Sequence, residues 1–159
     1  MSFVINPSCW NHYEHEVLFE LIESKNFFGV EELLDRLTVS EPLKEIFVSL
    51  SELQGSFDES EAFVKERTSN ERVLKALDRL KKVEQIVAMY GYEQYITVDL
   101  SMLSNYSYYT GVIFRAYTYG NGEALASGGR YDGLVAQFGK DAPAIGAVII
   151  VDQLMLALE

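Results

Sequence analysis

Two clusters in the second half of the chain carry residue types that bind small polar ligands. They are Tyr108-Tyr109-Thr110-Gly111 and Gly128-Gly129-Arg130-Tyr131-Asp132. A glycine pair lets the backbone approach a ligand closely, arginine offers a planar fork to a carboxylate or phosphate, and tyrosine hydroxyls hydrogen-bond small polar rings. The clusters therefore predict a pocket for a zwitterion or an aromatic-sized ligand. The alternative is structural: the glycines permit a sharp strand exit, and Arg130 pairs with Asp132.

Histidine and cysteine chemistry has little support in the sequence. His12 and His15 lie three residues apart on an expected helix, but a zinc site needs two further ligands, and Cys9 is the only other histidine or cysteine. A nucleophilic Cys9 paired with His12 would need a third group and an oxyanion hole, and the sequence indicates neither. We therefore predict surface histidines, no metal site, no catalytic residue and no cofactor.

Composition restricts the class of protein. The chain has 159 residues, 48% of them hydrophobic, and a net charge of −11 from 13 basic and 24 acidic side chains. The negative charge argues against nucleic acid as a partner. No apolar run approaches the roughly 18 residues that span a membrane. With one cysteine and no signal-peptide pattern, the chain is expected to be cytoplasmic.

The two halves of the chain differ in composition. Residues 1–91 hold 17 of the 24 acidic residues but three of the 11 glycines, and nine of the ten tyrosines fall from Tyr90 onward. A charged half followed by a glycine- and tyrosine-rich half predicts helices first and then strands with turns. We expect a helical block over 1–91 and a sheet over 92–159, packed as one compact α+β unit.

Local signals place the expected helices. Asn11 with Glu14 and Thr68 with Glu71 are candidate capping boxes, and Gly91 can provide a left-handed helix end. Apolar residues at three- and four-residue steps give each expected helix one buried face. These residues are Val17, Leu18, Leu21 and Ile22, then Val30, Leu33, Leu34 and Leu37, then Leu43, Ile46, Phe47 and Leu50 after Pro42, and last Val73, Leu77, Leu80, Val83, Val87 and Tyr90.

The second half changes to the period of strands. Residues 95–100 alternate, and 112–119 and 123–127 read as a hairpin joined by Gly120-Asn121-Gly122. Asp132 is expected to cap a short helix through Phe138. The apolar run 144–151 predicts a strand covered on both faces, after which Asp152 opens a last helix.

Three ordered segments resemble the histidyl-tRNA synthetase family. Residues 103–114 (Leu-Ser-Asn-Tyr-Ser-Tyr-Tyr-Thr-Gly-Val-Ile-Phe) are similar to its histidine-binding signature, 128–134 to a loop that closes over histidine, and 142–146 to the start of class II motif 3. The resemblance implies the later part of a class II synthetase-like antiparallel sheet, preceded by a helical insertion block. Motifs 1 and 2 would precede residue 1, and the anticodon domain would follow Glu159.

Three positions depart from the synthetase pattern. The signature reads Arg-Gly-Leu-Asp-Tyr-Tyr, and Ser104 stands where its arginine assists histidine activation. Motif 3 ends in Gly-Leu-Glu-Arg, whereas this chain has Ile150-Val151-Asp152-Gln153. Gln153 cannot offset triphosphate charge, and Ile150 puts a side chain where ATP needs bare backbone. Losing one such charge typically costs about 10²–10³ in rate, so the resemblance implies no adenylation activity.

Because it keeps the synthetase-like segments but lacks those arginines, this sequence resembles the regulatory subunits of ATP phosphoribosyltransferase. This resemblance implies a non-catalytic subunit required for activity and histidine feedback at the first step of histidine biosynthesis. Its implied partners are the short-form catalytic subunit and histidine, in a homo- and hetero-oligomer of the full-length protein. The alternatives are a histidyl-tRNA synthetase fragment, which ATP binding would indicate, and an interaction protein with a vestigial pocket, which would not bind histidine.

The resemblance also implies a role for each site residue. Tyr109 and Tyr131 would contact the imidazole side of histidine, Arg130 would steady the loop, and Gly128-Gly129 would let it close. Ser104 would keep a weak contact to the ligand carboxylate. Strand alternation would turn Tyr108, the neighbour of Tyr109, to the opposite side, where it packs.

Overall fold

A computed structural model describes residues 11–37, 39–104, 106 and 108–158. The chain divides into two compact units, residues 2–103 and 104–159, which we call the helical unit and the sheet unit. Helices precede an antiparallel sheet along the chain, as the predicted α+β class requires. The units separate after Leu103, whereas the composition changes near residue 91.

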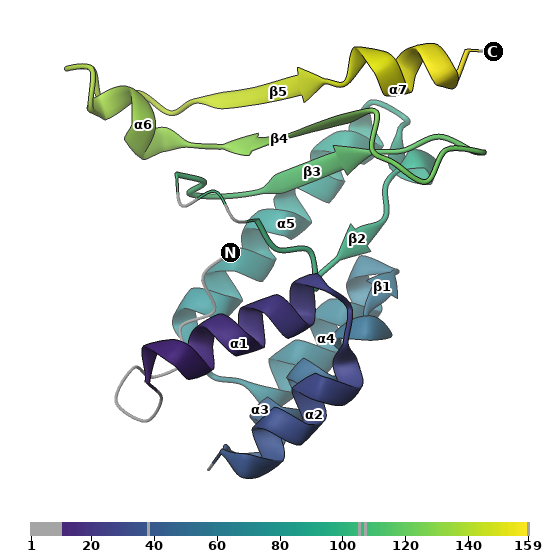
Figure 1. Ribbon diagram of the computed structural model, residues 1–159. Helices are drawn as coiled ribbons and strands as arrows, with labels where there is room; N and C mark the ends of the chain where they lie inside the picture. Colours follow the sequence, from purple (N-terminus) through teal and green to yellow (C-terminus); the bar gives the residue numbers. More distant parts are fainter. Residues whose placement is uncertain (1–10, 38, 105, 107, 159) are drawn as a thin grey trace. The chain divides into compact units, whose positions relative to one another are not determined.

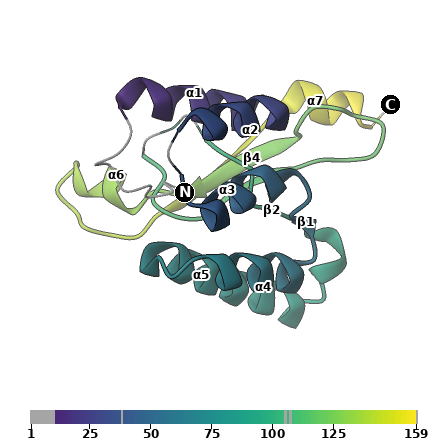
Figure 2. The ribbon, with the colours of Figure 1, turned by 90° about the horizontal axis from the view of Figure 1, so that it is seen from below.

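The helical unit consists of helices with one short strand pair (Figure 1). Figure 2 shows α4 and α5 side by side. Strands β1 and β2 pair antiparallel, so the predicted strand over 95–100 is reduced to a 3₁₀ turn and a two-residue strand. The elements are α1 (His12–Glu23), α2 (Phe27–Arg36), α3 (Glu41–Val48), η1 (Ser49–Ser51), β1 (Gln54–Gly55), α4 (Phe57–Arg67), α5 (Glu71–Met89), η2 (Glu93–Tyr95) and β2 (Val98–Asp99).

One hydrophobic core holds the helical unit together. Its buried side chains come from α1 through α5 and from the segment after β2. The three- and four-residue spacing seen in the sequence accounts for the helical members, because it brings them to one face of each helix. The core residues are Leu18, Ile22, Val30, Leu33, Leu34, Ile46, Phe47, Leu50, Leu53, Phe57, Val64, Leu77, Leu100 and Leu103.

Of the two predicted capping boxes, one is confirmed and one is wrong. Asn11 and Glu14 exchange hydrogen bonds at the start of α1, as expected. At α5, however, the Asn70 side chain accepts the Arg72 N–H, and Thr68 is the extended residue that ends α4. Because Thr68 already terminates one helix, the next helix begins only after the chain has turned.

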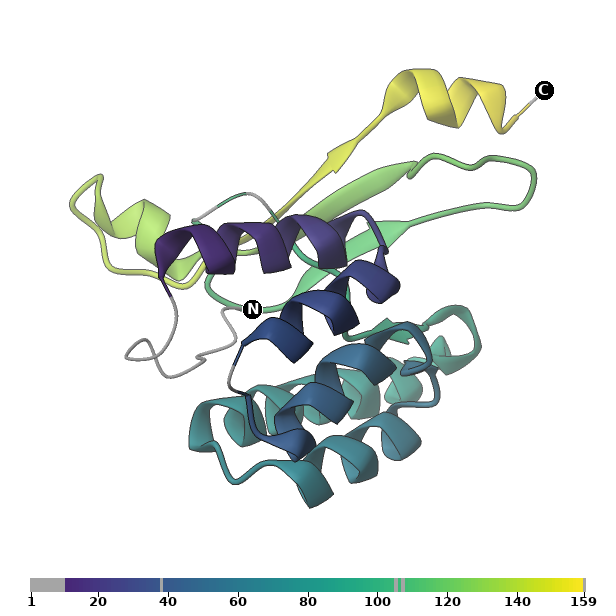
Figure 3. The ribbon, with the colours of Figure 1, turned by 60° about the horizontal axis from the view of Figure 1, so that its bottom comes forward.

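A short turn joins α1 to α2 (Figure 3). It contains a lysine in the left-handed region. Lys25 has φ +58°, and its N–H donates to the Ile22 carbonyl while that of Asn26 donates to Leu21, the pattern of a Schellman helix end. Glycine usually takes this position. Lys25 differs from glycine in reaching Asp99 at 3.0 Å and the buried Ser101 hydroxyl, so its side chain fastens the turn to β2.

The contacts of Asp99 predict a loss of stability in acid. Burial of the Asp99 carboxyl opposes ionisation, but hydrogen bonds from Ser101 and Lys25, with the Lys25 charge, outweigh it and lower the pKa of Asp99. A carboxyl with a lowered folded-state pKa contributes stability above its unfolded pKa of about 3.9, and loses it as pH falls through the folded value. Asp99→Asn is therefore expected to be less stable than the wild type at pH 7, with the difference shrinking below about pH 4.

Urea unfolding from pH 7 to pH 3 measures this difference in unfolding free energy. Glu59→Gln, at an exposed position on α4, is the control for the loss of one negative charge. A difference between Asp99→Asn and the wild type that stays constant in acid would contradict the role of the Asp99 ionisation.

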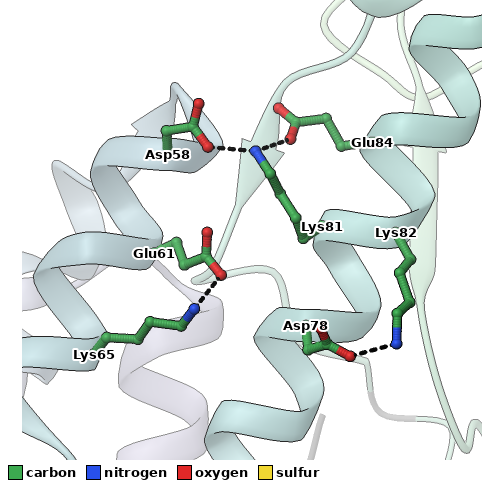
Figure 4. A network of polar contacts seen from close by, with 7 residues as sticks. All are labelled: Asp58, Glu61, Lys65, Asp78, Lys81, Lys82 and Glu84. Carbon is green, nitrogen blue, oxygen red and sulfur yellow. Dashed lines mark hydrogen bonds and ion pairs between the residues drawn. The ribbon is translucent and has the colours of Figure 1, made fainter.

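One ion pair connects α4 to α5, and others lie within each helix (Figure 4). Lys81 on α5 contacts both Asp58 on α4 and Glu84, and these hydrogen bonds raise the pKa of Lys81, with that from Asp58 the largest cause. Within single helices, Lys82 pairs with Asp78 at 2.6 Å, and Lys65 pairs with Glu61. Exposed pairs of this kind contribute little to stability. These contacts are surface ion pairs of the two helices and do not form a ligand site.

The sheet unit is a three-stranded antiparallel sheet with a short helix at each end of β5 (Figure 1). The strand order is β3-β4-β5, with Phe114 and Ala147 both opposite Gly128, and Ile113 and Gly146 both opposite Gly129. The elements are β3 (Ile113–Ala116), β4 (Ala126–Arg130), α6 (Asp132–Ala136), β5 (Ile145–Ile149) and α7 (Val151–Leu156).

The predicted hairpin is confirmed, but its connection is longer than expected. The strands end at Ala116 and resume at Ala126, so the predicted turn lies within a nine-residue loop, 117–125. The loop is tied to α7 by the Asn121 amide, which donates to the Gln153 side chain at 3.0 Å. Contacts outside the hairpin therefore take part in fixing the loop.

Two other expectations for this half are wrong. Asp132 does not cap α6, because its carboxylate is engaged by Arg130 and by the Ala144 N–H. The β5 strand is not covered on both faces: it lies at the edge of the described sheet, and Ile145, Val148 and Ile149 are exposed. An apolar run predicts a strand but does not identify what packs on it.

Candidate ligand-binding site

Three segments of the sheet unit meet at the end of β4 nearest α6. The Thr110 N–H donates to the Arg130 carbonyl at 2.8 Å, and the Arg130 N–H donates to the Val112 carbonyl at 3.0 Å. On the other side, the Tyr131 N–H donates to the Ala144 carbonyl at 2.8 Å. These backbone bonds bring the two clusters of the sequence together and add the segment that leads into β5.

Two tyrosine rings cover a pair of glycines at this junction. Gly129 and Gly146 are cross-strand partners, so the Cβ positions of both point to the same face of the sheet. A Cβ on Gly129 would lie 2.8 Å from the Tyr109 ring, and one on Gly146 would lie 2.5 Å from Tyr131 Oη. Tyr109 and Tyr131 therefore lie on the same face of the sheet. A side chain at Gly129 would displace the Tyr109 ring, and one at Gly146 would displace the Tyr131 ring.

Tyr108 joins this group, contrary to the prediction that it faces away. Its ring centroid lies 4.7 Å from that of Tyr109 and 6.0 Å, edge to face, from that of Tyr131. Tyr108 and Tyr109 lie in a turn before β3 rather than in a strand, so strand alternation does not apply to them. A hydrogen bond with Tyr109, followed by burial, raises the pKa of Tyr108. With Tyr106 stacked on Tyr108, four tyrosines form the cluster.

Arg130 pairs with Asp132, as the structural alternative predicted. Its Nε donates to the two carboxylate oxygens at 2.9 and 2.8 Å. Strand alternation places Arg130 on the face opposite Gly129, and thus opposite the two tyrosine rings. The side chain consequently holds the chain around Tyr131, while the tyrosines provide the ring surfaces.

The positions that depart from the synthetase pattern make contacts away from the three segments of the site. The Ser104 hydroxyl accepts the Tyr106 N–H at 3.2 Å, and no hydrogen bond between described residues joins Ser104 to the three segments. Gln153 is held by Asn121, and the Ile150 N–H donates to the Leu125 carbonyl at the start of α7. Two further positions of the signature, Asn105 and Ser107, lie outside the described residues.

Thr110 and Ala144 also have roles at the site that the sequence did not indicate. The Thr110 hydroxyl accepts the Asp132 N–H at 3.0 Å across 22 residues, and the Ala144 N–H donates to the Asp132 carboxylate at 3.2 Å across 12. No local pattern in the sequence marks such a partner, because the strand register brings it into contact.

Histidine and carboxylate groups of the described residues form no cluster suited to a metal ion. His12 pairs with Glu16 at 3.1 Å within α1. The predicted alternative of a Cys9–His12 pair involves Cys9, which lies outside the described residues. No helix in the described part of the chain is both long enough and apolar enough to cross a membrane.

Comparisons with known proteins agree on the family. A profile of histidyl-tRNA synthetase matches residues 2–154. Proteins named ATP phosphoribosyltransferase regulatory subunit are 41% identical in Acetivibrio thermocellus, over 92% of this chain, and 42% identical in Clostridium kluyveri, over 98%. The chain spans 35% and 40% of the length of these two relatives.

Solved structures show the same fold. A structure from Bacillus halodurans, described as an ATP phosphoribosyltransferase regulatory subunit/histidyl-tRNA synthetase, is 31% identical with a TM-score of 0.83, covering 94% of this chain and 39% of its own. A histidine–tRNA ligase subunit from Alicyclobacillus acidocaldarius is 25% identical with a TM-score of 0.71, covering 94% of this chain and 49% of its own. The predicted synthetase-like α+β fold is thus confirmed, and the chain belongs to the histidyl-tRNA synthetase family.

Proposed function

We propose that this chain is part of a regulatory subunit of ATP phosphoribosyltransferase, that it binds histidine at the tyrosine cluster, and that it performs no adenylation. The observation that carries the proposal is the name shared by curated relatives that are 39–42% identical over nearly the whole chain. The whole protein would act with the short-form catalytic subunit in a hetero-oligomer in the cytoplasm. There it would be required for activity and for histidine feedback on the first step of histidine biosynthesis.

The geometry of the cluster suits an imidazole. Tyr109 and Tyr131 each use one part of the ring to cover a glycine, and Tyr108 contacts both rings. Aromatic rings pack edge to face or offset against a planar ligand, and phenol hydroxyls both donate and accept hydrogen bonds, as the two nitrogens of a neutral imidazole require. In this proposal Gly128-Gly129 let the loop close over histidine, and Arg130 steadies the loop through Asp132.

The absence of adenylation is proposed from charge. Ser104 and Gln153 are neutral at the positions where the synthetase pattern has arginines. Gln153 is also engaged with Asn121, an amide pair that provides no positive charge for a triphosphate. Since adenylate formation depends on stabilising phosphate charge, this arrangement supports ligand binding without catalysis.

Thermal unfolding with histidine, with ATP and with neither tests the proposal. Histidine at 100 times its dissociation constant is expected to stabilise the chain by about 2.7 kcal/mol, and ATP is expected to have no effect. Tyr131→Phe keeps the ring over Gly146 but removes the hydroxyl, and should weaken histidine binding roughly two- to tenfold. Tyr119→Phe, on a fully exposed tyrosine of the same unit, is the matched control.

Each ligand distinguishes a different alternative. Stabilisation by ATP would favour a fragment of a histidine–tRNA ligase, the activity named for the Alicyclobacillus structure. No response to histidine would contradict a histidine site within this chain and favour an interaction protein with a vestigial pocket.

A further inference from the structure

The residues on both sides of Tyr131 are held by a set of hydrogen bonds that converge on Asp132. Its carboxylate accepts Arg130 Nε at 2.9 and 2.8 Å, and one of its oxygens also accepts the Ala144 N–H at 3.2 Å. Its own N–H donates to the Thr110 hydroxyl at 3.0 Å. Asp132 thereby contacts all three segments that form the candidate site.

These contacts constrain Tyr131 in particular. The residue before it, Arg130, is held by hydrogen bonds of its backbone carbonyl and N–H. The Tyr131 N–H donates to the Ala144 carbonyl. The residue after it, Asp132, is held by hydrogen bonds with Thr110 and Ala144. Ala144 is two residues from Gly146, the glycine that the Tyr131 ring covers. The same hydrogen bonds therefore hold both the ring and the backbone beneath it.

The Arg130–Asp132 ion pair is too exposed to be a major source of stability. About a third of each side chain is accessible, 38% for Arg130 and 33% for Asp132. Partly exposed pairs contribute little to the free energy of folding. A fixed set of contacts, in which the Arg130 Nε–H is shared between both carboxylate oxygens and the backbone is bonded as well, has more effect on where a neighbouring side chain lies, which matters for a ligand site.

We propose that Asp132 and Thr110 are positioning residues, which hold the Tyr131 ring over Gly146 in the orientation that the ligand meets. The histidine part of this inference rests on the proposed function. Neither residue needs to touch the ligand: both act through the backbone on either side of Tyr131.

Ligand affinity is one test, with histidine as the probe and titration calorimetry on the folded chain. Thr110→Val is nearly isosteric but removes the acceptor of the Asp132 N–H, and Asp132→Ala removes the carboxylate. Each is expected to weaken histidine binding about tenfold. Thr110→Ser, which keeps the hydroxyl, should restore wild-type affinity. Asp141→Ala, at an exposed position of the same unit, is the matched control. Wild-type affinity in Thr110→Val would overturn the proposal.

A ligand-free measurement separates this inference from the proposed function. The Tyr131 ring over Gly146 should shift the Gly146 Hα resonances through its ring current, and Tyr131→Leu defines their position without the ring. In Thr110→Val and Asp132→Ala these resonances should move toward the Tyr131→Leu values, while those of Gly122, in the distant hairpin loop, stay in place. Unchanged Gly146 resonances would overturn the positioning role. Shifted resonances without histidine binding by the wild type would support positioning and contradict the histidine site.

Discussion

Replacing Gly128 with alanine is expected to lower the unfolding free energy of the sheet unit by about 3 kcal/mol, at the upper end of the usual cost of overpacking. A Cβ at this position would overlap the Gly146 carbonyl oxygen and would lie 2.9 Å from Ala147 Cα and 2.7 Å from Phe114 Cζ. Two of these atoms belong to the β5 backbone, which cannot rotate away as the end of a side chain can. The pairing of β4 with β5 must therefore loosen.

Hydrogen exchange of the β4 and β5 amides measures this effect. Gly133→Ala in α6 is the matched control, because a Cβ there meets no atom within 4 Å. In a helix this substitution should be neutral or stabilising by about 0.5–1 kcal/mol. Similar amide protection in the two variants would show that β5 yields to the Gly128 side chain, against this prediction.

Replacing Phe47 with alanine should have one of the largest effects in the helical unit, about 3–5 kcal/mol. Phe47 and Phe57 are its largest side chains that are almost completely buried, each with 1% of its surface exposed, and Phe47 packs in the core shared by α1 to α5. Deleting the ring removes its burial and leaves a cavity that the surrounding helices fill only in part. Urea unfolding followed by far-ultraviolet circular dichroism measures the change.

Phe28 provides the control for this substitution. It lies on α2 with 78% of its surface exposed, so Phe28→Ala removes the same atoms from solvent rather than from the core. A change within about 0.5 kcal/mol is expected. If the two phenylalanine variants lost equal stability, the core assignment of Phe47 would be wrong.

The helical unit was the more predictable part of the fold. Its apolar spacing depends on residues three and four apart, so the sequence contains the signal directly, and Leu18, Phe47 and Leu77 are buried as that spacing predicts. The predicted buried face of α5 is wrong toward its end, because Val83 and Tyr90 are exposed. The error at Thr68 has a local cause as well. Thr68 and Asn70 are both good caps, and the end of α4 determines which of them is free to begin α5.

The sequence predicted which residues form the candidate site but not how their side chains are arranged in space. Both clusters were identified from their glycines, tyrosines and arginine, and the structure brings them together. The sequence could not place Tyr108, because alternation holds only within a strand and the turn before β3 was not anticipated. Nor could it decide whether Asp132 caps α6 or binds Arg130, since both partners are local and either contact is chemically reasonable.

The sequence by itself determined the class of fold, the apolar faces of the helices, the neutral residues at 104 and 153, and the membership of one family. These are properties of residue type and short spacing. The tertiary structure alone decided that Lys25 reaches Asp99 across 74 residues, that Thr110 holds Asp132, and that two tyrosine rings cover the Gly129–Gly146 pair. Such contacts depend on strand register and chain closure over long separations, and no local pattern of residues encodes them.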